Sequence, residues 1–344
     1  MRQRVIDGKA TTEHTEHTEF ERRRRDIAPR ASRRSKGGDG SSHCHGVSVV
    51  ILFLRSLRAP RLLSDARARL QSRDVITLTL REPPPVPLEA DVLSPDTIAP
   101  LTIDEIRALP VQLGKRQRRL DDFFAVEGEP SDEVEIHGDV RRVKWIGRGM
   151  TRGVLRIRGG AGMHLGSAMA GGTIEVWGDA GDWLGAEMSG GLIHVHGDAG
   201  GQIGAAYRGA PSGMTDGVIV VDGSAGLEVG MRMKRGTIVV GGMARDFAGL
   251  QMKGGTIVLS DGAELRTGAW MNRGTIISLK PIALLPTFAY AAAYNPTFLR
   301  LYARRLAPLG CALPYDDQQG RYQRYTGDSA VPGRGEILVW EPRG

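Results

Sequence analysis

The chain has 344 residues and a formal net charge of +7, from 46 basic and 39 acidic residues. Residues 1–72 hold 16 Lys or Arg and 8 Asp or Glu, so the remaining residues hold 30 and 31 and are nearly neutral. Because the basic excess belongs to the N-terminal segment, a nucleic-acid-binding fold is excluded. Two cysteines, Cys44 and Cys311, give no disulfide framework, and the apolar run at 47–54 is too short to cross a bilayer. We therefore expect a soluble, cytoplasmic protein.

Residues 1–72 have a composition that is not expected to form a hydrophobic core. They contain the low-complexity run TTEHTEHTE, clustered arginines and a Gly/Ser/His stretch. We interpret this segment as disordered or as a non-native extension, with translation starting near Val75, rather than as a functional basic tail. A metal clamp at His43, Cys44 and His45 is not expected, because three adjacent residues cannot all face one ion.

Residues 73–131 are predicted to form a small N-terminal cap. The alternation at 75–80 predicts a strand, and Ser94-Pro95-Asp96 and Thr102 to Glu105 are helix-start signals. Residues 114–120 are expected to be a basic loop. Phe123 and Phe124 follow it and are expected to pack on the open end of the structure that comes next.

A nineteen-residue period organises residues 132–280, and a period of this size indicates a repeat architecture. The step between successive opening glycines is nineteen throughout, except for one step of twenty-six that we interpret as an insertion at 210–216. The opening glycines are Gly153, Gly172, Gly191, Gly217, Gly236, Gly255 and Gly274.

Each repeat is predicted to begin with a short strand that has one buried face. Apolar residues fill its third and fifth positions, as in Leu155 and Ile157 or Ile238 and Val240. Nineteen residues suit one coil of a parallel β-solenoid in which each strand pairs with its equivalent about 4.8 Å away. The predicted fold class is therefore all-β, a solenoid with a small N-terminal cap and a C-terminal helical tail.

A second column of the repeat is rich in methionine, and we expect it to form a stack inside the coils rather than a copper or cofactor site. Its predicted members are Met169, Met188, Tyr207, Met233, Met252 and Met271.

The turns before the strands carry basic residues that stacking is expected to align along one edge. The candidate binding residues are Arg208, Lys234, Arg235 and Lys253. Such a ridge suits an acidic partner, a polyanion or the acidic tail of a cofactor. The alternative is a set of solvated, charged turns.

No metal site and no catalytic site are expected in this chain. His194 and His196 lie two apart on one strand, but no third ligand is evident, so we interpret them as surface residues. Asp179 and Asp198 head adjacent turns without a proton-donating partner. Nucleophile elbows, phosphate-binding loops and Cys-x-x-Cys pairs do not occur in the sequence.

Residues 281–344 follow the last repeat. Residues 290–309 are predicted to be helical, with Phe298, Leu299, Tyr302 and Leu306 on one face. This helix is expected to cap the far end of the coils or to dock on another protein of an assembly. A short strand is predicted at 336–340.

The coils, with glycine, methionine and Gly-Asp-Ala-Gly at fixed positions, resemble the C subunit of formylmethanofuran dehydrogenase and, more closely, that of the bacterial formyltransferase/hydrolase complex. The likeness covers about residues 76–344, including the leader VITLTLREPPPVPLEADVLSPDTIAPL and the tail from Tyr290. The coils are also similar to the C-terminal GxGxG domain of glutamate synthase. The resemblance implies a right-handed parallel β-helix.

The resemblance also implies a non-catalytic scaffold subunit in one-carbon metabolism linked to tetrahydromethanopterin and methanofuran, where a formyl group becomes formate. Its partners would be amidohydrolase-like, formyltransferase and B-type subunits. A methanofuran-type cofactor, with an acidic glutamyl tail, would belong to the complex, and a molybdenum or tungsten pterin only to a sibling subunit of the redox version. The alternative is a glutamate synthase-type domain of an amidotransferase oxidoreductase.

Overall fold

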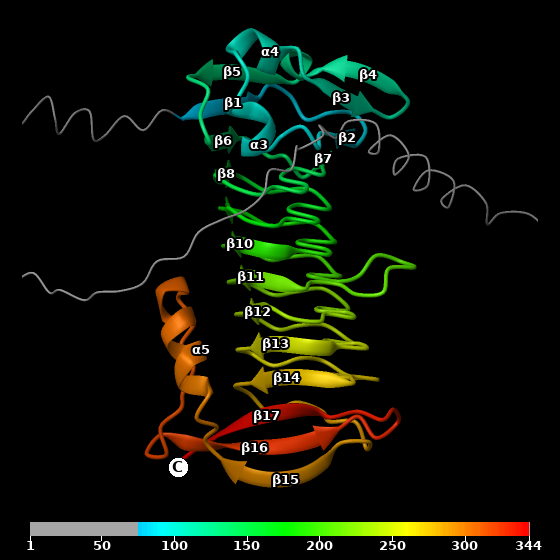
Figure 1. The fold of residues 1–344 in the computed structure, drawn as a ribbon, viewed down its shortest axis with the longest axis vertical. Coiled ribbons are helices and arrows are strands. Elements are labelled where there is room, and N and C mark those ends of the chain that lie inside the picture. The colour runs from blue at the N-terminus through cyan, green and yellow to red at the C-terminus, as the bar shows by residue number, and fades with distance from the viewer. Residues whose placement is uncertain (1–74, 344) are drawn as a thin grey trace, which may run out of the picture. The chain divides into compact units, whose positions relative to one another are not determined.

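The computed structural model describes residues 75–343, which consist mostly of β-strands (Figure 1). The expectations for residues 1–72, including the His43, Cys44 and His45 cluster, lie outside the described residues. The strands form one sheet of 13 strands and one of four. Between residues 75 and 343, no helix is long and apolar enough to cross a membrane.

The repeats supply most of the large sheet, with one strand from each repeat. Neighbouring strands run parallel and in register, so that Ile219 pairs with Ile238, and Ile238 with Ile257. This confirms a mostly β fold built on a large, mixed and largely parallel sheet. The strands are β6 (Glu133–His137), β8 (Val154–Arg158), β9 (Thr173–Val176), β10 (Ser189–Val195), β11 (Asp216–Val221), β12 (Thr237–Val240), β13 (Lys253–Leu259) and β14 (Arg273–Ser278).

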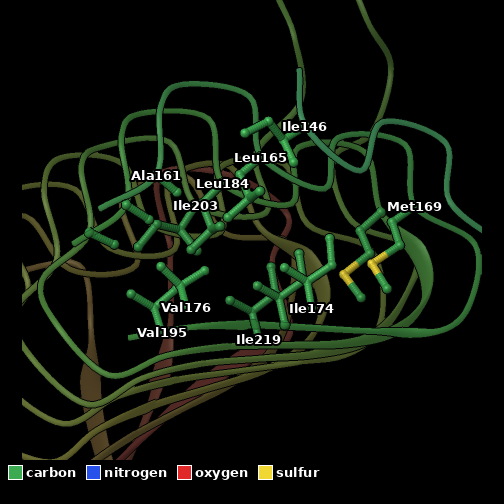
Figure 2. Close-up of a cluster of buried hydrophobic side chains, with 14 of the residues drawn as sticks. Ile146, Ala161, Leu165, Met169, Ile174, Val176, Leu184, Val195, Ile203 and Ile219 are labelled. Carbon is green, nitrogen blue, oxygen red and sulfur yellow. The ribbon is translucent and has the colours of Figure 1, made fainter. Parts of the chain in front are cut away.

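The core follows from the period-2 alternation within each strand. Side chains at the third and fifth repeat positions point inward and are fully buried, as Ile174 and Val176 illustrate (Figure 2). Leucine and isoleucine from the opposite side of the repeat, such as Leu184 and Ile203, close the interior. Each fully buried aliphatic side chain stabilises the fold by roughly 1.5–3 kcal/mol.

The turns keep the same register as the strands. Ala161, Ala180 and Ala199 form successive parallel bridges, and the series continues to Ala263. The backbone of one repeat therefore lies against the next at several points around its course, which leaves little room for side chains at the facing glycines.

The methionine stack is confirmed, except that Tyr207 is not one of its members. Met188 donates its N–H to the carbonyl of Gly185, and Met214 makes the same bond to Gly204. The Met214 methyl also faces Gly236, as the Met188 methyl faces Gly217. Met214 therefore replaces Tyr207 in the stack, and the seven inserted residues are 207–213. Because Tyr207 stands nineteen residues after Met188, the period alone selected the wrong residue.

The N-terminal cap extends the sheet by two strands. Strand β1 (Ile76–Leu80) pairs with β6 in parallel and with β5 (Phe124–Gly128) in antiparallel orientation, and Phe124 is fully buried. Both helix starts are confirmed. Ser94 caps α3 (Pro95–Ile98), and Thr102 with Glu105 forms a capping box for α4 (Ile103–Arg107).

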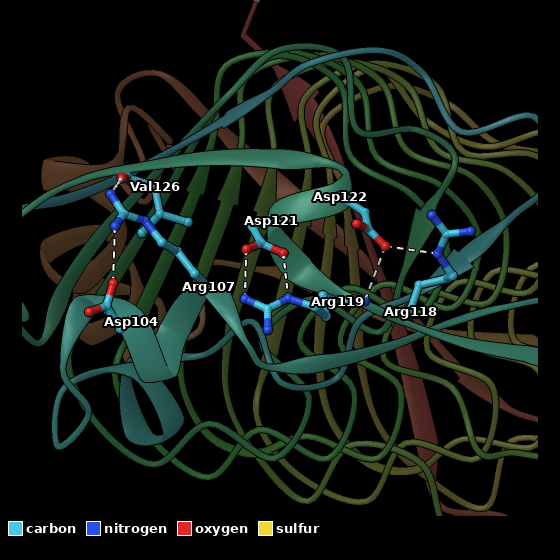
Figure 3. Close-up of polar contacts among 7 residues, drawn as sticks. All are labelled: Asp104, Arg107, Arg118, Arg119, Asp121, Asp122 and Val126. Atoms are coloured by element: carbon cyan, nitrogen blue, oxygen red, sulfur yellow. Dashed lines mark hydrogen bonds and ion pairs between the residues drawn. The ribbon is translucent and has the colours of Figure 1, made fainter.

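The predicted basic loop is instead part of a hairpin. Strands β3 (Pro110–Leu113) and β4 (Arg116–Arg119) pair with each other in the small sheet, which β2 (Leu88–Glu89) and β7 (Val143–Lys144) complete. The 3-10 turn η2 (Leu120–Asp122) follows and supplies two carboxylates to the hairpin (Figure 3).

These carboxylates neutralise two of the arginines. Arg119 forms a bidentate pair with Asp121 at 2.9 and 2.8 Å, and Arg118 Nε lies 2.8 Å from Asp122. The hydrogen bonds from the guanidinium groups lower the pKa of both aspartates. The sequence run appeared purely basic only because these acids follow it in the chain.

The C-terminal segment is only partly helical. Residues 289–294 form strand β15 (Ala289–Tyr294), so the predicted helix start is wrong, and α5 covers Leu299–Leu306 before the turn η3 (Ala307–Leu309). Strand β16 (Gly320–Gly327) joins β15 to β17 (Gly335–Pro342), and β17 pairs in parallel with β14. The strand predicted at 336–340 is confirmed within β17.

Helix α5 lies along the outer face of the large sheet rather than at the end of the stacked repeats (Figure 1). Leu299 and Leu306 pack against Val239, Val258 and Ile277, all buried. The middle outward position of β11 to β14 is therefore apolar, whereas the equivalent position earlier in the sheet, at Glu135 and Arg156, is polar.

Candidate functional site

The predicted basic ridge is aligned by backbone contacts between repeats. Lys234 donates its N–H to the carbonyl of Met214 at 2.8 Å, and Lys253 makes the equivalent bond to Met233 at 2.7 Å. The side chains of Lys234 and Arg235 are exposed. Within residues 75–343, neither forms an ion pair, so both are available to an external anion.

The inserted segment lies beside this ridge. The Lys253 ammonium donates to the carbonyl of Pro211, and the Arg232 guanidinium donates to that of Ala210 at 3.2 Å. Arg208 is exposed within the same insert. The structure therefore brings Lys234, Arg235 and Lys253 to one edge, whereas Arg208 belongs to a loop outside the regular repeat.

Aromatic side chains and one histidine stack along another edge. Trp145 and His164 are nearly parallel with ring centroids 4.0 Å apart, and Trp183 and Tyr207 stack at 4.8 Å. The Trp145, His164 and Trp183 backbones all have left-handed φ values of 64–69°, so equivalent turns project these side chains in the same direction. Tyr207 joins them because the insert carries it out of the methionine stack.

His164 is held neutral in this stack. Burial, together with the positive charges of Lys144 and Arg148, lowers its pKa from 6.5 to about 4. The Nδ1 atom lies 2.8 Å from the Tyr207 hydroxyl. The neutral imidazole of His164 is therefore part of the packed stack, and protonating it would destabilise the folded state.

His164 is expected to make the protein acid-sensitive. Because its pKa is about 4 when folded and 6.5 when unfolded, the unfolded state binds the extra proton between these values, and stability falls as the pH drops through this window. In His164→Asn, which tolerates the left-handed backbone, this part of the loss is expected to disappear. Urea unfolding from pH 7 to pH 4 measures it, and parallel curves for the two proteins would contradict the assignment.

His194 and His196 have a third neighbour that the repeat spacing hid. Asp222 places Oδ1 2.9 Å from His194 Nε2 and Oδ2 2.8 Å from His196 Nδ1. Asp222 is therefore a third potential ligand that is not evident from the sequence. Asp222 stands twenty-six residues after His196, so the insertion conceals that the two occupy equivalent positions in adjacent repeats.

A groove at the surface combines two exposed apolar side chains with several polar ones. It has a volume of about 650 Å³, and its lining includes Leu227, Met243, Arg245 and Glu264. Leu227 and Met243 are 45% and 43% exposed. Large apolar side chains grouped at the surface are typical of protein–protein contacts.

Comparison with known proteins identifies the family. A scan against models of protein families gave no match. The C subunit of the tungsten-containing formylmethanofuran dehydrogenase 2 of Methanothermobacter thermautotrophicus is 42% identical over 97 residues, 27% of this chain and 36% of that protein. The C subunit of the molybdenum-containing formylmethanofuran dehydrogenase 1 of the same organism is 45% identical over 83 residues, 24% of this chain. The chain thus spans 36% and 21% of the lengths of these two relatives.

The solved structures extend the match to a whole chain. One chain of the crystal structure of the formyltransferase/hydrolase complex (FhcABCD) from Methylorubrum extorquens in complex with methylofuran is 34% identical, with a TM-score of 0.71. The likeness covers 78% of this chain and 100% of that one. The chain belongs to the family of C subunits shared by the formyltransferase/hydrolase complex and formylmethanofuran dehydrogenases. The described residues of this family member contain the stacked repeats, the regions that flank them and the basic ridge.

Proposed function

We propose that this chain is a non-catalytic scaffold subunit of a formyltransferase/hydrolase-type complex that converts a formyl group to formate. The observation that carries the proposal is the match over the full length of one chain of the solved complex. The redox version of the complex, with a tungsten or molybdenum pterin on a sibling subunit, remains the alternative within the family. The glutamate synthase-type interpretation is not favoured, because the relatives found by sequence are C subunits of formylmethanofuran dehydrogenases.

We also propose the architecture of the scaffold. Residues 132–280 form a right-handed parallel β-helix between a cap at 73–131 and a tail at 281–344. The in-register parallel strands and the alanine bridges support this arrangement, because both repeat at the same step. Such a stack presents fixed surfaces on several sides, and the groove at Leu227 and Met243 is one that suits a partner.

Affinity purification of the tagged full-length chain from its native extract tests this function. Mass spectrometry of the co-purified proteins should find an amidohydrolase-like subunit, a formyltransferase and a B-type subunit in fixed proportion. A molybdopterin-binding subunit among them would move the proposal to the dehydrogenase version. Recovery of the chain without any stoichiometric partner would refute the scaffold function.

The basic ridge is proposed as the contact for an acidic cofactor tail or an acidic partner surface. Lys234 and Arg235 supply exposed cations, and Lys253 and Arg208 lie at the adjoining insert. A methanofuran-type cofactor with carboxylates fits this donor set, since ammonium and guanidinium groups pair with carboxylates. The cofactor would supply the formyl-carrying amine, and these residues would only hold its tail.

Reversing this charge should weaken the contact. Lys234→Glu with Arg235→Glu changes four charge units, and we expect about tenfold lower retention of the acidic cofactor or partner, because exposed pairs contribute roughly 0.2–1 kcal/mol each. Retention is measured at low and high salt, since screening should reduce the difference.

The matched control is Lys115→Glu with Arg116→Glu. This pair has the same residue types and exposure but lies in the cap hairpin. The control should bind as the unchanged protein does. Equal retention by the two double variants would eliminate the ridge as the contact.

A further inference from the structure

We propose that His194, His196 and Asp222 form a binding site for zinc or a similar divalent transition metal on the outer face of the large sheet. Their potential ligand atoms, one nitrogen from each imidazole and one carboxylate oxygen, all lie within 4.8 Å of one another. Ligand atoms that share one zinc ion at about 2.0–2.2 Å lie about 3–4 Å apart. Binding an ion therefore requires small rotations of these partly exposed side chains to reach that spacing.

The backbone places the three residues with little freedom. His194 is in β10, and His196 donates its N–H to the carbonyl of Val176 at 2.9 Å. Asp222 makes the equivalent bond to Val195, also at 2.9 Å, so it stands one repeat further along the same column. His196 and Asp222 directly follow the ends of the paired strands β10 and β11, and their backbone bonds to the neighbouring repeat hold them more accurately than a free loop would, which favours a preformed site.

Two carboxylates surround His196 and supply the negative charge that a bound cation needs. His196 faces a carboxylate through both ring nitrogens, with Nδ1 near Asp222 and Nε2 3.2 Å from Glu175 Oε1. A protonated imidazole would donate to both carboxylates, whereas a neutral imidazole has a single N–H and donates to only one of them. Donation from Nε2 to Glu175 leaves the Nδ1 lone pair for a metal, which is the carboxylate–histidine–metal arrangement of many zinc sites.

The donor set selects the class of metal. Two imidazoles and one carboxylate suit zinc and related transition metals, whereas calcium and magnesium prefer oxygen ligands. The half-exposed position leaves a coordination site for water or for a donor from another molecule. We therefore assign the site to zinc. Glu175 orients His196 and is a positioning residue rather than a ligand.

Zinc titration of the full-length, chelator-treated chain by isothermal calorimetry tests the site. We expect one zinc ion bound with ligands His194, His196 and Asp222, and at least about 100-fold weaker binding after His194→Ala or Asp222→Ala. Glu175→Gln should weaken binding by about 10–100-fold. With cobalt(II) as the probe, the Glu175→Gln protein should keep the visible spectrum of the site, because its ligands are intact.

Two control variants separate this site from other histidines. His137→Ala removes a partly exposed histidine whose Nε2 lies 2.8 Å from Glu135. His43→Ala with His45→Ala removes the histidines of the N-terminal cluster. Both should retain the calorimetric site. Unchanged zinc affinity in His194→Ala and Asp222→Ala, or loss of all binding in the His43/His45 variant, would overturn the proposal.

Discussion

Gly162→Ala is expected to destabilise the protein by about 3 kcal/mol or more, the upper part of the range for overpacking. A Cβ at this position would lie 2.1 Å from the Val143 carbonyl oxygen and 2.9 Å from its carbon. Both atoms belong to the backbone of strand β7, so no side-chain rotation relieves the contact. The variant must instead separate two backbone segments that are held together by hydrogen bonds, and urea unfolding measures the cost.

Gly209→Ala is the matched comparison. Gly209 has φ +87°, but a Cβ there meets nothing within 4 Å. Only the left-handed conformation is penalised, at roughly 1–2 kcal/mol. If Gly162→Ala were as stable as Gly209→Ala, the close approach of successive turns would not be what requires glycine at position 162.

Ile238→Ala should cost about 2–5 kcal/mol, as expected for a cavity in a well-packed core. Ile238 is fully buried in β12 and pairs with Ile219 on one side and Ile257 on the other. Neighbours held in register above and below cannot collapse into the space. Thermal and urea unfolding of the full-length chain should agree on the size of the loss.

A graded series makes the second test sharper. Ile238→Val should cost roughly 0.5–1.5 kcal/mol, since one methylene is removed. Leu301→Ala on α5 removes a leucine that is 69% exposed and should change the free energy of unfolding by less than about 0.5 kcal/mol. A loss at Leu301 equal to that at Ile238 would place the stabilising core elsewhere.

The inward face of the repeat could be predicted because its signal is local. Alternation places Ile174 and Val176 on one side of a strand whatever the surrounding structure, and the nineteen-residue step then stacks the strands. The helix caps at Ser94 and Thr102 were predictable for the same reason. Each depends on residues within one helical turn.

The outer face could not be predicted in this way, because its partners come from distant parts of the chain. Strands β12 and β13 carry apolar residues on both faces. Their outward valines, Val239 and Val258, are covered by α5, and nothing within the repeats indicates that helix. The strand β15 exists because β16, about thirty residues later, pairs with it. An alanine- and tyrosine-rich run is compatible with helix until that partner is known.

The insertion explains the remaining errors. Counting in steps of nineteen put Tyr207 in the methionine stack and concealed that Asp222 follows His196 in the same outer column. Aligning the outward positions across the insertion, as well as the inward ones, would have brought His194, His196 and Asp222 together from the sequence.

Native mass spectrometry of the chain purified from its own cells tests whether it is a scaffold subunit. We expect one dominant assembly in which this chain is present with at least two different polypeptides in whole-number ratio. We also expect formyl transfer and hydrolysis to be catalysed by those other polypeptides. A spectrum containing only the single chain, or catalytic activity retained by that chain alone, would contradict the assignment as a scaffold subunit.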